Sequence, residues 1–181
     1  SEYAELDRWV LAELNQLVAG VDSDLEHYAP ADAGRKIEGF VDDLSNWYVR
    51  RSRRRFWKSE NDVDKLSAYT TLYQCLVTLS QLIAPFMPFL AEELYQSLVG
   101  PVSPDEPASV HLSDFPVADP ALIDKKLMED VRLAMRVSSM GRAARSQAGI
   151  KVRQHLIKLL VKVNTKEQKE ALTRLAPQVL E

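Results

Sequence analysis

Apolar residues recur at three- and four-residue intervals along most of this 181-residue chain, which is the period of an amphipathic α-helix. This pattern predicts successive helices over residues 6–28, about 30–58, about 62–84 and 88–98. Pro30, Pro85 and Pro88 mark their boundaries, because the residue before a proline avoids helical geometry and a first helical turn tolerates proline. Short connections between such helices predict an antiparallel bundle.

The pattern changes in the last third of the chain. Residues 100–120 hold five of the nine prolines and are predicted to be an irregular crossing segment, followed by a fifth helix over about 121–146. Residues 156–163 are β-prone and partly alternating, which predicts a strand, and a short helix over 165–176 is expected to begin at Thr165. The predicted fold is therefore mainly α: a helical bundle over residues 1–149 and, over 150–181, the start of a small α+β appendage.

Composition narrows the range of functions. With 23 basic and 26 acidic residues the net charge is −3, so an anionic partner would have to be recognised by a local basic patch. Cys75 lies among apolar positions and is expected to be a packed thiol, and the three histidines are too scattered for a metal site. No stretch has transmembrane length and the N-terminus lacks the pattern of a signal peptide. We expect a monomeric, cytoplasmic piece of a longer protein.

One stripe of the second predicted helix changes from apolar to cationic. Its inward positions, Phe40, Leu44 and Tyr48, continue at the same angle to Arg51 and Arg55. Buried guanidinium groups are costly unless they are paired. We therefore expect these two arginines to form ion pairs within the bundle or to contact another domain, with Glu92 and Glu93 as candidate partners.

The same helix carries a basic run. Residues 50–58 hold six positive charges and no negative one, and Trp47 and Trp57 bracket the run. Guanidinium groups bind phosphate through two parallel hydrogen bonds and indoles stack on bases, so the run fits a nucleic-acid backbone. A solvated face or a set of ion pairs would explain the charges equally well. Trp57 is the better candidate for stacking, whereas Trp47 lies nearer the apolar stripe and is expected in the core.

A second basic cluster follows the fifth predicted helix, at Arg142, Arg145, Lys151 and Arg153. Basic residues at a helix C-terminus also complement the helix dipole, so a structural role is equally open. The chain has no Gly-rich phosphate loop, no paired-cysteine motif and no arrangement typical of a catalytic triad. Catalysis by this chain alone is therefore not expected.

Three segments carry a family resemblance. The run from Asp43 to Trp57 (DLSNWYVRRSRRRFW), residues 84–93 (APFMPFLAEE) and residues 148–154 (AGIKVRQ) resemble the anticodon-binding helical domain of isoleucyl-tRNA synthetases. The first and third segments are the more specific. The family usually continues the third with proline, where this chain has His155.

The resemblance implies docking of the anticodon stem and loop of isoleucine tRNA. The candidate contacts are Arg50, Arg53, Arg54, Trp57, Lys58, Arg142, Arg145, Lys151, Arg153 and Gln154. It also implies a parent enzyme that uses ATP and Mg²⁺ in a catalytic domain outside these residues, with no cofactor in the residues themselves. Two alternatives stay open: a module that binds an acidic protein surface, and a scaffold with no useful tRNA affinity.

Overall fold

A computed structural model describes residues 3–58, 62–103, 105–151 and 154–180. The chain divides into two compact units, Ser1–Asp124 (unit 1) and Lys125–Glu181 (unit 2). Sequence alone placed a boundary after Gly149. The division falls earlier because α6, Lys125–Gln147, packs against the helices that follow it.

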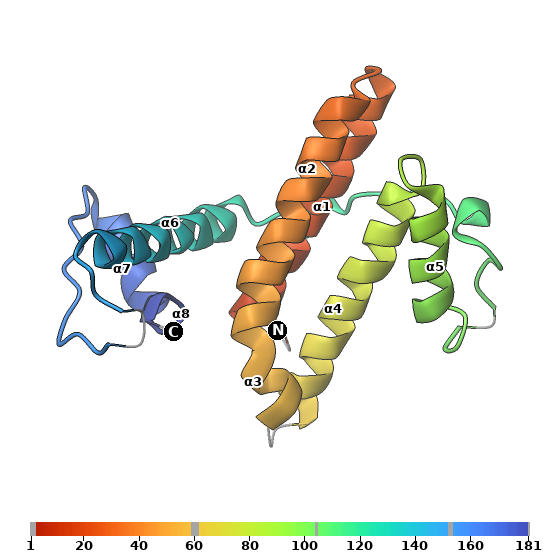
Figure 1. The fold of residues 1–181 in the computed structure, drawn as a ribbon. Helices are drawn as coiled ribbons and strands as arrows, with labels where there is room; N and C mark the ends of the chain where they lie inside the picture. The colour runs from red at the N-terminus through yellow and green to blue at the C-terminus, as the bar shows by residue number, and fades with distance from the viewer. Residues whose placement is uncertain (1–2, 59–61, 104, 152–153, 181) are drawn as a thin grey trace. The chain divides into compact units, whose positions relative to one another are not determined.

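Unit 1 is helical, as the periodicity predicted (Figure 1). Its helices are α1 Glu5–Glu26, α2 Pro30–Asp43, the π-helix η1 Leu44–Val49, α3 Arg50–Lys58, α4 Asp62–Ile83 and α5 Pro88–Leu98. The helices α1 and α2 run side by side as a hairpin. Its core contains the fully buried Trp9, Val10 and Val21 of α1 and the buried Ile37 and Phe40 of α2.

The single helix predicted over about 30–58 is continuous in backbone conformation but contains a π-helical turn. Leu44 and Arg50, which border this turn, both have right-handed helical dihedrals, so the chain runs from α2 through η1 into α3 without a break. A π-turn inserts an extra residue and thereby rotates the faces that follow. Ser52, four residues after the buried Tyr48, is fully buried.

The segment over residues 100–120 is largely irregular, as predicted, and contains the 3₁₀ turn η2, Val110–Leu112. Val110 packs with Ala91, Tyr95 and Val99 in a hydrophobic cluster at α5. Further along, the backbone amide of Asp119 donates to Asn15 Oδ1 at 2.8 Å, which ties the crossing segment to α1. The 3₁₀ turn η3, Pro120–Leu122, then precedes α6, which begins at Lys125 and not near 121.

Unit 2 consists of α6, α7 Lys166–Arg174 and α8 Ala176–Leu180. Thr165 caps α7 as predicted, because its hydroxyl oxygen accepts from the amide of Gln168. Asp130 of α6 is almost fully buried and accepts from Lys126 at 2.7 Å and from Arg174 of α7 at 2.8 Å. This pairing joins α6 to α7.

The strand predicted over residues 156–163 is not formed. The part of the chain that the structure describes contains no strand, and these residues run as an irregular segment between α6 and α7. The physical reason is the absence of a partner: a strand needs a second strand to satisfy its amides and carbonyls. The α+β character of residues 150–181 is therefore not seen.

Two helices end in the same hydrogen-bonding motif with different residues at its key position. At the end of α1 the amide of Ala29 bonds to the carbonyl of Asp24, and that of Tyr28 bonds to Leu25. At the end of α6, Ile150 and Gly149 repeat these bonds. The motif requires one residue with a positive φ. At the end of α6 this residue is a glycine, Gly149, with φ 66°, whereas at the end of α1 it is Tyr28, with φ 56°. The side chain of Tyr28 is also 93% exposed, so packing of its ring does little to offset the cost of the positive φ.

We predict that Tyr28→Gly stabilises unit 1 by about 1 kcal/mol, because glycine adopts positive φ without the clash that a Cβ causes. The matched control is Gly149→Ala, which should destabilise by a similar amount since it introduces that clash into the same motif. Urea unfolding at neutral pH measures both. A Tyr28→Gly variant that is less stable than wild type would contradict the strain.

Candidate nucleic-acid interface

The outer side of α3 presents the basic run. Arg50, Arg53 and Arg54 are exposed, and the ring of Trp57 is 71% exposed. Lys58 is the last residue of the same helix. We call the set Arg50, Arg53, Arg54 and Trp57 the arginine row. Its members lie on one short helix, so the position of α3 determines where all of them point.

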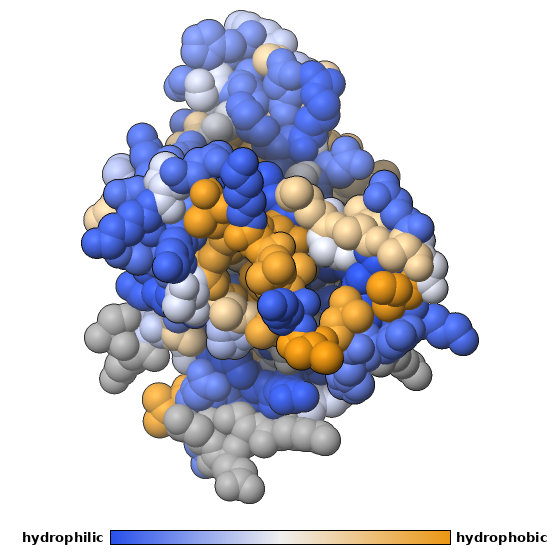
Figure 2. All heavy atoms as spheres, turned by 90° about the vertical axis from the view of Figure 1, so that its left-hand side faces the viewer, coloured by the Kyte–Doolittle hydropathy of each residue, from blue (hydrophilic) through white to orange (hydrophobic). Residues whose placement is uncertain are grey.

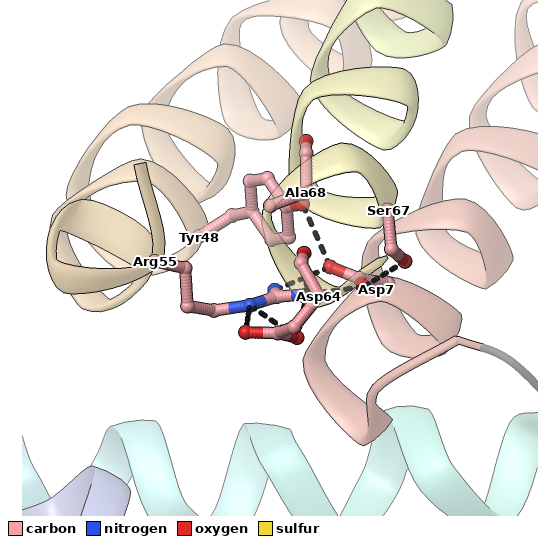
Figure 3. Close-up of polar contacts among 6 residues, drawn as sticks. All are labelled: Asp7, Tyr48, Arg55, Asp64, Ser67 and Ala68. Carbon is pink, nitrogen blue, oxygen red and sulfur yellow. Dashed lines mark hydrogen bonds and ion pairs between the residues drawn. The ribbon is translucent and has the colours of Figure 1, made fainter. Parts of the chain in front are cut away.

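Arg55 lies on the opposite side and anchors α3 in the bundle (Figure 3). Its two terminal nitrogens donate to the two carboxylate oxygens of Asp7, each at 2.7 Å. Its Nε donates to both oxygens of Asp64, at 3.0 and 3.1 Å. The Asp7 side chain is fully buried and that of Arg55 is only 16% exposed. The guanidinium group thus links α3 to the first turns of α1 and α4.

Asp7 receives two further hydrogen bonds. The Tyr48 hydroxyl donates to Oδ1 at 2.7 Å and the Ser67 hydroxyl donates to Oδ2 at 2.9 Å (Figure 3). We call Asp7, Tyr48, Arg55, Asp64 and Ser67 the buried network. Its members come from α1, η1, α3 and α4, so the network links these four segments at one end of the bundle.

The environment holds these groups in their charged or donating forms. Burial raises the pKa of Asp7, but hydrogen bonds from Arg55, Tyr48 and Ser67 and the charge of Arg55 outweigh it and leave the pKa below 3.8. Burial lowers the pKa of Arg55, yet the two aspartates raise it more, so the guanidinium stays charged. Burial and then the charge of Asp7 raise the pKa of Tyr48, which keeps its hydroxyl a donor.

Helix ends account for the placement of the charges. Asp7 lies in the first turn of α1 and Asp64 in the first turn of α4, where the helix dipole favours a negative charge. Arg55 lies in the second half of α3, nearer the end that favours a positive one. Because α3 and α4 pack against each other, that end of α3 lies close to Asp64.

Arg51 stacks on an indole, and Glu92 of α5 binds the crossing segment. The guanidinium carbon of Arg51 lies 3.1 Å from the ring centroid of Trp47, which is buried as predicted. Glu92 accepts from the Ser109 hydroxyl at 2.8 Å and from the Val110 amide at 3.0 Å, and Glu93 is exposed. Glu92 therefore holds the crossing segment against α5.

The second basic cluster belongs to unit 2. Arg142 and Lys151 are exposed. The Arg145 guanidinium donates to the backbone carbonyls of Lys151, at 2.8 Å, and of Gln154, so it holds the loop after α6. The side chain of Gln154 is exposed. Arg153 lies outside the described residues.

Sequence reasoning missed Asp7 and Asp64 as the partners of Arg55. A signal for Asp7 was present, because it precedes Val10 and Leu14 by three and seven residues and so lies on the inward stripe of α1. An aspartate at such a position needs a cation. Asp64 has no such signal, since it is partly exposed and resembles any acidic residue of a first helical turn.

Other kinds of site find no support in the described part of the chain. No group of three or more histidine, cysteine or acidic side chains there could hold a metal ion. None of the helices that the structure describes is both long and apolar enough to cross a bilayer. Cys75 is fully buried as predicted, and its burial followed by the charge of Asp7 raises the thiol pKa to about 12.

A helical bundle with a row of arginines and an exposed indole on its surface is compatible with binding of a nucleic acid. The chain belongs to the family of anticodon-binding domains of tRNA ligases, whose model matches residues 7–161. That match includes the whole buried network and the arginine row.

Its curated relatives include isoleucine–tRNA ligases, in agreement with the sequence resemblance. The chain is similar to that of Dehalococcoides mccartyi strain 195, with 64% identity over 99% of this chain and 18% of the relative. It is 48% identical to that of Thermus thermophilus over 98% of this chain and 17% of the relative. The ligase of Porphyromonas gingivalis is 46% identical over 97% and 15%. The chain thus spans less than a fifth of their length.

We predict that Arg55→Ala destabilises unit 1 by about 3–5 kcal/mol, because it leaves the Asp7 carboxylate buried without its cation. Arg53→Ala, on the exposed side of the same helix, should change the free energy of unfolding by less than about 0.5 kcal/mol. Urea unfolding at neutral pH gives both values. Equal effects would contradict the role of the buried network.

The lowered pKa of Asp7 predicts an acid-dependent loss of stability. A carboxylate whose pKa is lower in the folded state stabilises the fold above its unfolded pKa, and this contribution is lost as the pH falls from about 4 through the folded pKa. Asp7→Asn removes the titration, so the unfolding free energy of the variant should fall less steeply below about pH 4 than that of wild type. Parallel profiles from urea unfolding would contradict the assignment.

Proposed function

We propose that this chain docks the anticodon stem and loop of isoleucine tRNA as part of a longer isoleucine–tRNA ligase. The observation that carries the proposal is the arginine row on α3, which the buried network holds outward. Membership of the anticodon-binding family supports tRNA as the partner. The curated isoleucine–tRNA ligases support the choice of tRNA.

In this proposal cations fix the register and other side chains read bases. Arg50, Arg53, Arg54 and Lys58 contact phosphates, because guanidinium and ammonium groups bind phosphate oxygens without regard to sequence. Trp57 stacks on an unpaired base, since its ring is exposed at the end of the row.

Unit 2 contributes a second set of contacts. Arg142, Lys151 and Arg153 are proposed for phosphates and Gln154 for a base edge. Arg145 acts through the loop, because its guanidinium binds the carbonyls of Lys151 and Gln154 and so shapes the backbone that carries them.

The parent protein in this proposal joins isoleucine to its tRNA with ATP and Mg²⁺ in a catalytic domain of the same polypeptide. The anticodon-binding residues position the tRNA so that its acceptor end reaches that domain. This role belongs to a cytoplasmic protein, and we propose that the chain acts as a monomer.

The test is fluorescence anisotropy of labelled isoleucine tRNA against this chain, with a tRNA of another anticodon measured in parallel over a series of salt concentrations. We expect tighter binding of isoleucine tRNA and a log–log salt slope that falls by about 0.7–0.9 for each arginine removed. The Arg50→Ala/Arg53→Ala variant should therefore lower the slope by about 1.4–1.8.

The control is Arg35→Ala, which removes an exposed arginine of α2 from the same unit but away from the row. It should leave the slope unchanged. Equal binding of the two tRNAs would place specificity outside these residues. No salt-dependent binding would favour a scaffold, and binding of an acidic protein surface in place of tRNA would favour an interaction module.

A further inference from the structure

Asp64 of α4 contacts the second half of α3, which carries Arg54 and Trp57. The Nε of Arg55 donates to both carboxylate oxygens of Asp64, and one terminal nitrogen lies 2.8 Å from Oδ1 of the same carboxylate (Figure 3). That nitrogen also donates to the backbone carbonyl of Asp64 at 3.3 Å. Arg55 therefore binds both the side chain and the backbone of Asp64.

Tyr69, further along α4, makes a second contact with the same part of α3. Its ring centroid lies 5.1 Å from that of Phe56. Its hydroxyl donates to the carbonyl of Phe56 at 3.4 Å. This carbonyl is one of the last four of α3, which have no partner within their own helix. We call Asp64 and Tyr69 the α4 clamp, because together they hold the end of α3.

Both residues of the α4 clamp are partly exposed, in contrast to Asp7. The side chain of Asp64 is 34% exposed and Tyr69 is 48% exposed, whereas the side chain of Asp7 is fully buried. Ion pairs that are partly exposed add little to the free energy of unfolding. A change at Asp64 also leaves Arg55 its two hydrogen bonds to Asp7. Loss of the clamp should therefore loosen the end of α3 without unfolding unit 1.

The charge of Asp64 has the wrong sign for a direct role at the arginine row. A carboxylate beside Arg54 and Arg55 lowers the positive potential there, so its charge alone would weaken binding of a phosphate backbone. Its contacts, on the other hand, order the helix that presents the row. These two effects on binding have opposite signs, and experiment can therefore separate them.

We propose that Asp64 and Tyr69 are positioning residues for tRNA binding. They hold the end of α3 so that Arg54 and Trp57 point toward the RNA, and they make no contact with it themselves. The apparent affinity of a ligand is reduced by the fraction of molecules that are in the binding-competent state, so a loosened α3 binds less tightly. This inference rests on the proposed function, but one of its readouts requires no tRNA.

The first test compares Asp64→Asn with Asp32→Asn by anisotropy of labelled isoleucine tRNA. Each variant removes one negative charge from the first turn of a helix and one partner from an arginine, because Asp32 is paired with Arg35. We expect Asp64→Asn to weaken binding by about twofold to fivefold, which corresponds to the loss of a partly exposed ion pair. Asp32→Asn should not weaken it.

Two results of this test would be adverse, and they differ in what they overturn. Equal or tighter binding by Asp64→Asn, when the wild-type chain binds tRNA, would overturn the positioning role and leave the proposed function in place. Absence of salt-dependent binding by the wild-type chain would overturn the proposed function and the positioning role with it.

Tyr69→Ala repeats the test without a change of charge. Tyr73→Ala is the matched control, because Tyr73 is a second exposed tyrosine of α4. We expect Tyr69→Ala to bind tRNA about twofold to fivefold more weakly than Tyr73→Ala does. Equal affinities of the two variants would overturn the role of Tyr69.

The readout without tRNA is hydrogen exchange of the α3 amides in the chain alone. In Asp64→Asn the amides of residues 54–58 should exchange about twofold to fivefold faster than in wild type, while those of α1 keep their rates. Asp32→Asn should change neither set. Unchanged exchange in α3 would overturn the proposal. Equally faster exchange in α1 would mean that the whole unit is destabilised, and this result would overturn it as well.

Self-association is monitored in all titrations by light scattering at the same protein concentrations. Figure 2 shows hydrophobic side chains gathered on the face that unit 2 turns to the viewer, and Ile157 and Leu160 are among the exposed residues of this unit. Exposed apolar side chains of this kind can cause association between copies. A difference in affinity that disappears when only monomer is present would overturn the proposal.

Discussion

The removal of the Asp7 carboxylate from water is the constraint on which one end of unit 1 depends. A buried carboxylate without a cation is strongly unfavourable, and Arg55 supplies the cation with two parallel hydrogen bonds. Satisfying this pair requires α1, α3 and α4 to meet at one point, since Asp64 and Ser67 come from α4. The ion pair therefore fixes the geometry of three helices more than it adds to their net stability.

The inward face of the helix that leads into α3 continues through the π-turn. Leu44, Tyr48 and Ser52 follow one another at four-residue steps, and all three are buried. Arg55 follows Ser52 by three residues and therefore faces the same side. Arg51 lies at the edge of this face and stacks on Trp47. Arg50, Arg53 and Arg54 are exposed.

The sequence predicts much of this structure where the cause is local. Periodicity and prolines predicted the helices of unit 1, and Thr165 predicted the start of α7. The π-turn was not predicted, because it results from packing and no residue type specifies it. The partners of Arg55 were also missed: Asp7 is 48 residues away in sequence. The strand over 156–163 was predicted from side-chain pattern, but a strand also depends on a second segment that the pattern does not contain.

Charge is distributed unevenly between the two ends of the α1–α2 hairpin in unit 1. Residues 50–58 carry six positive charges, whereas residues 22–34, at the tip of the α1–α2 hairpin, carry four acidic residues and no lysine or arginine. The two stretches lie at opposite ends of the hairpin (Figure 1). Charges are screened over about 8–10 Å at physiological salt, so each end acts on its own surroundings and the net charge of −3 has little influence. The α3 end is therefore the more positive one, although Asp32 and Asp24 at the tip are paired with Arg35 and Lys36. In the proposed function this asymmetry would direct an approaching RNA to the α3 end before any base is contacted, in spite of the negative net charge.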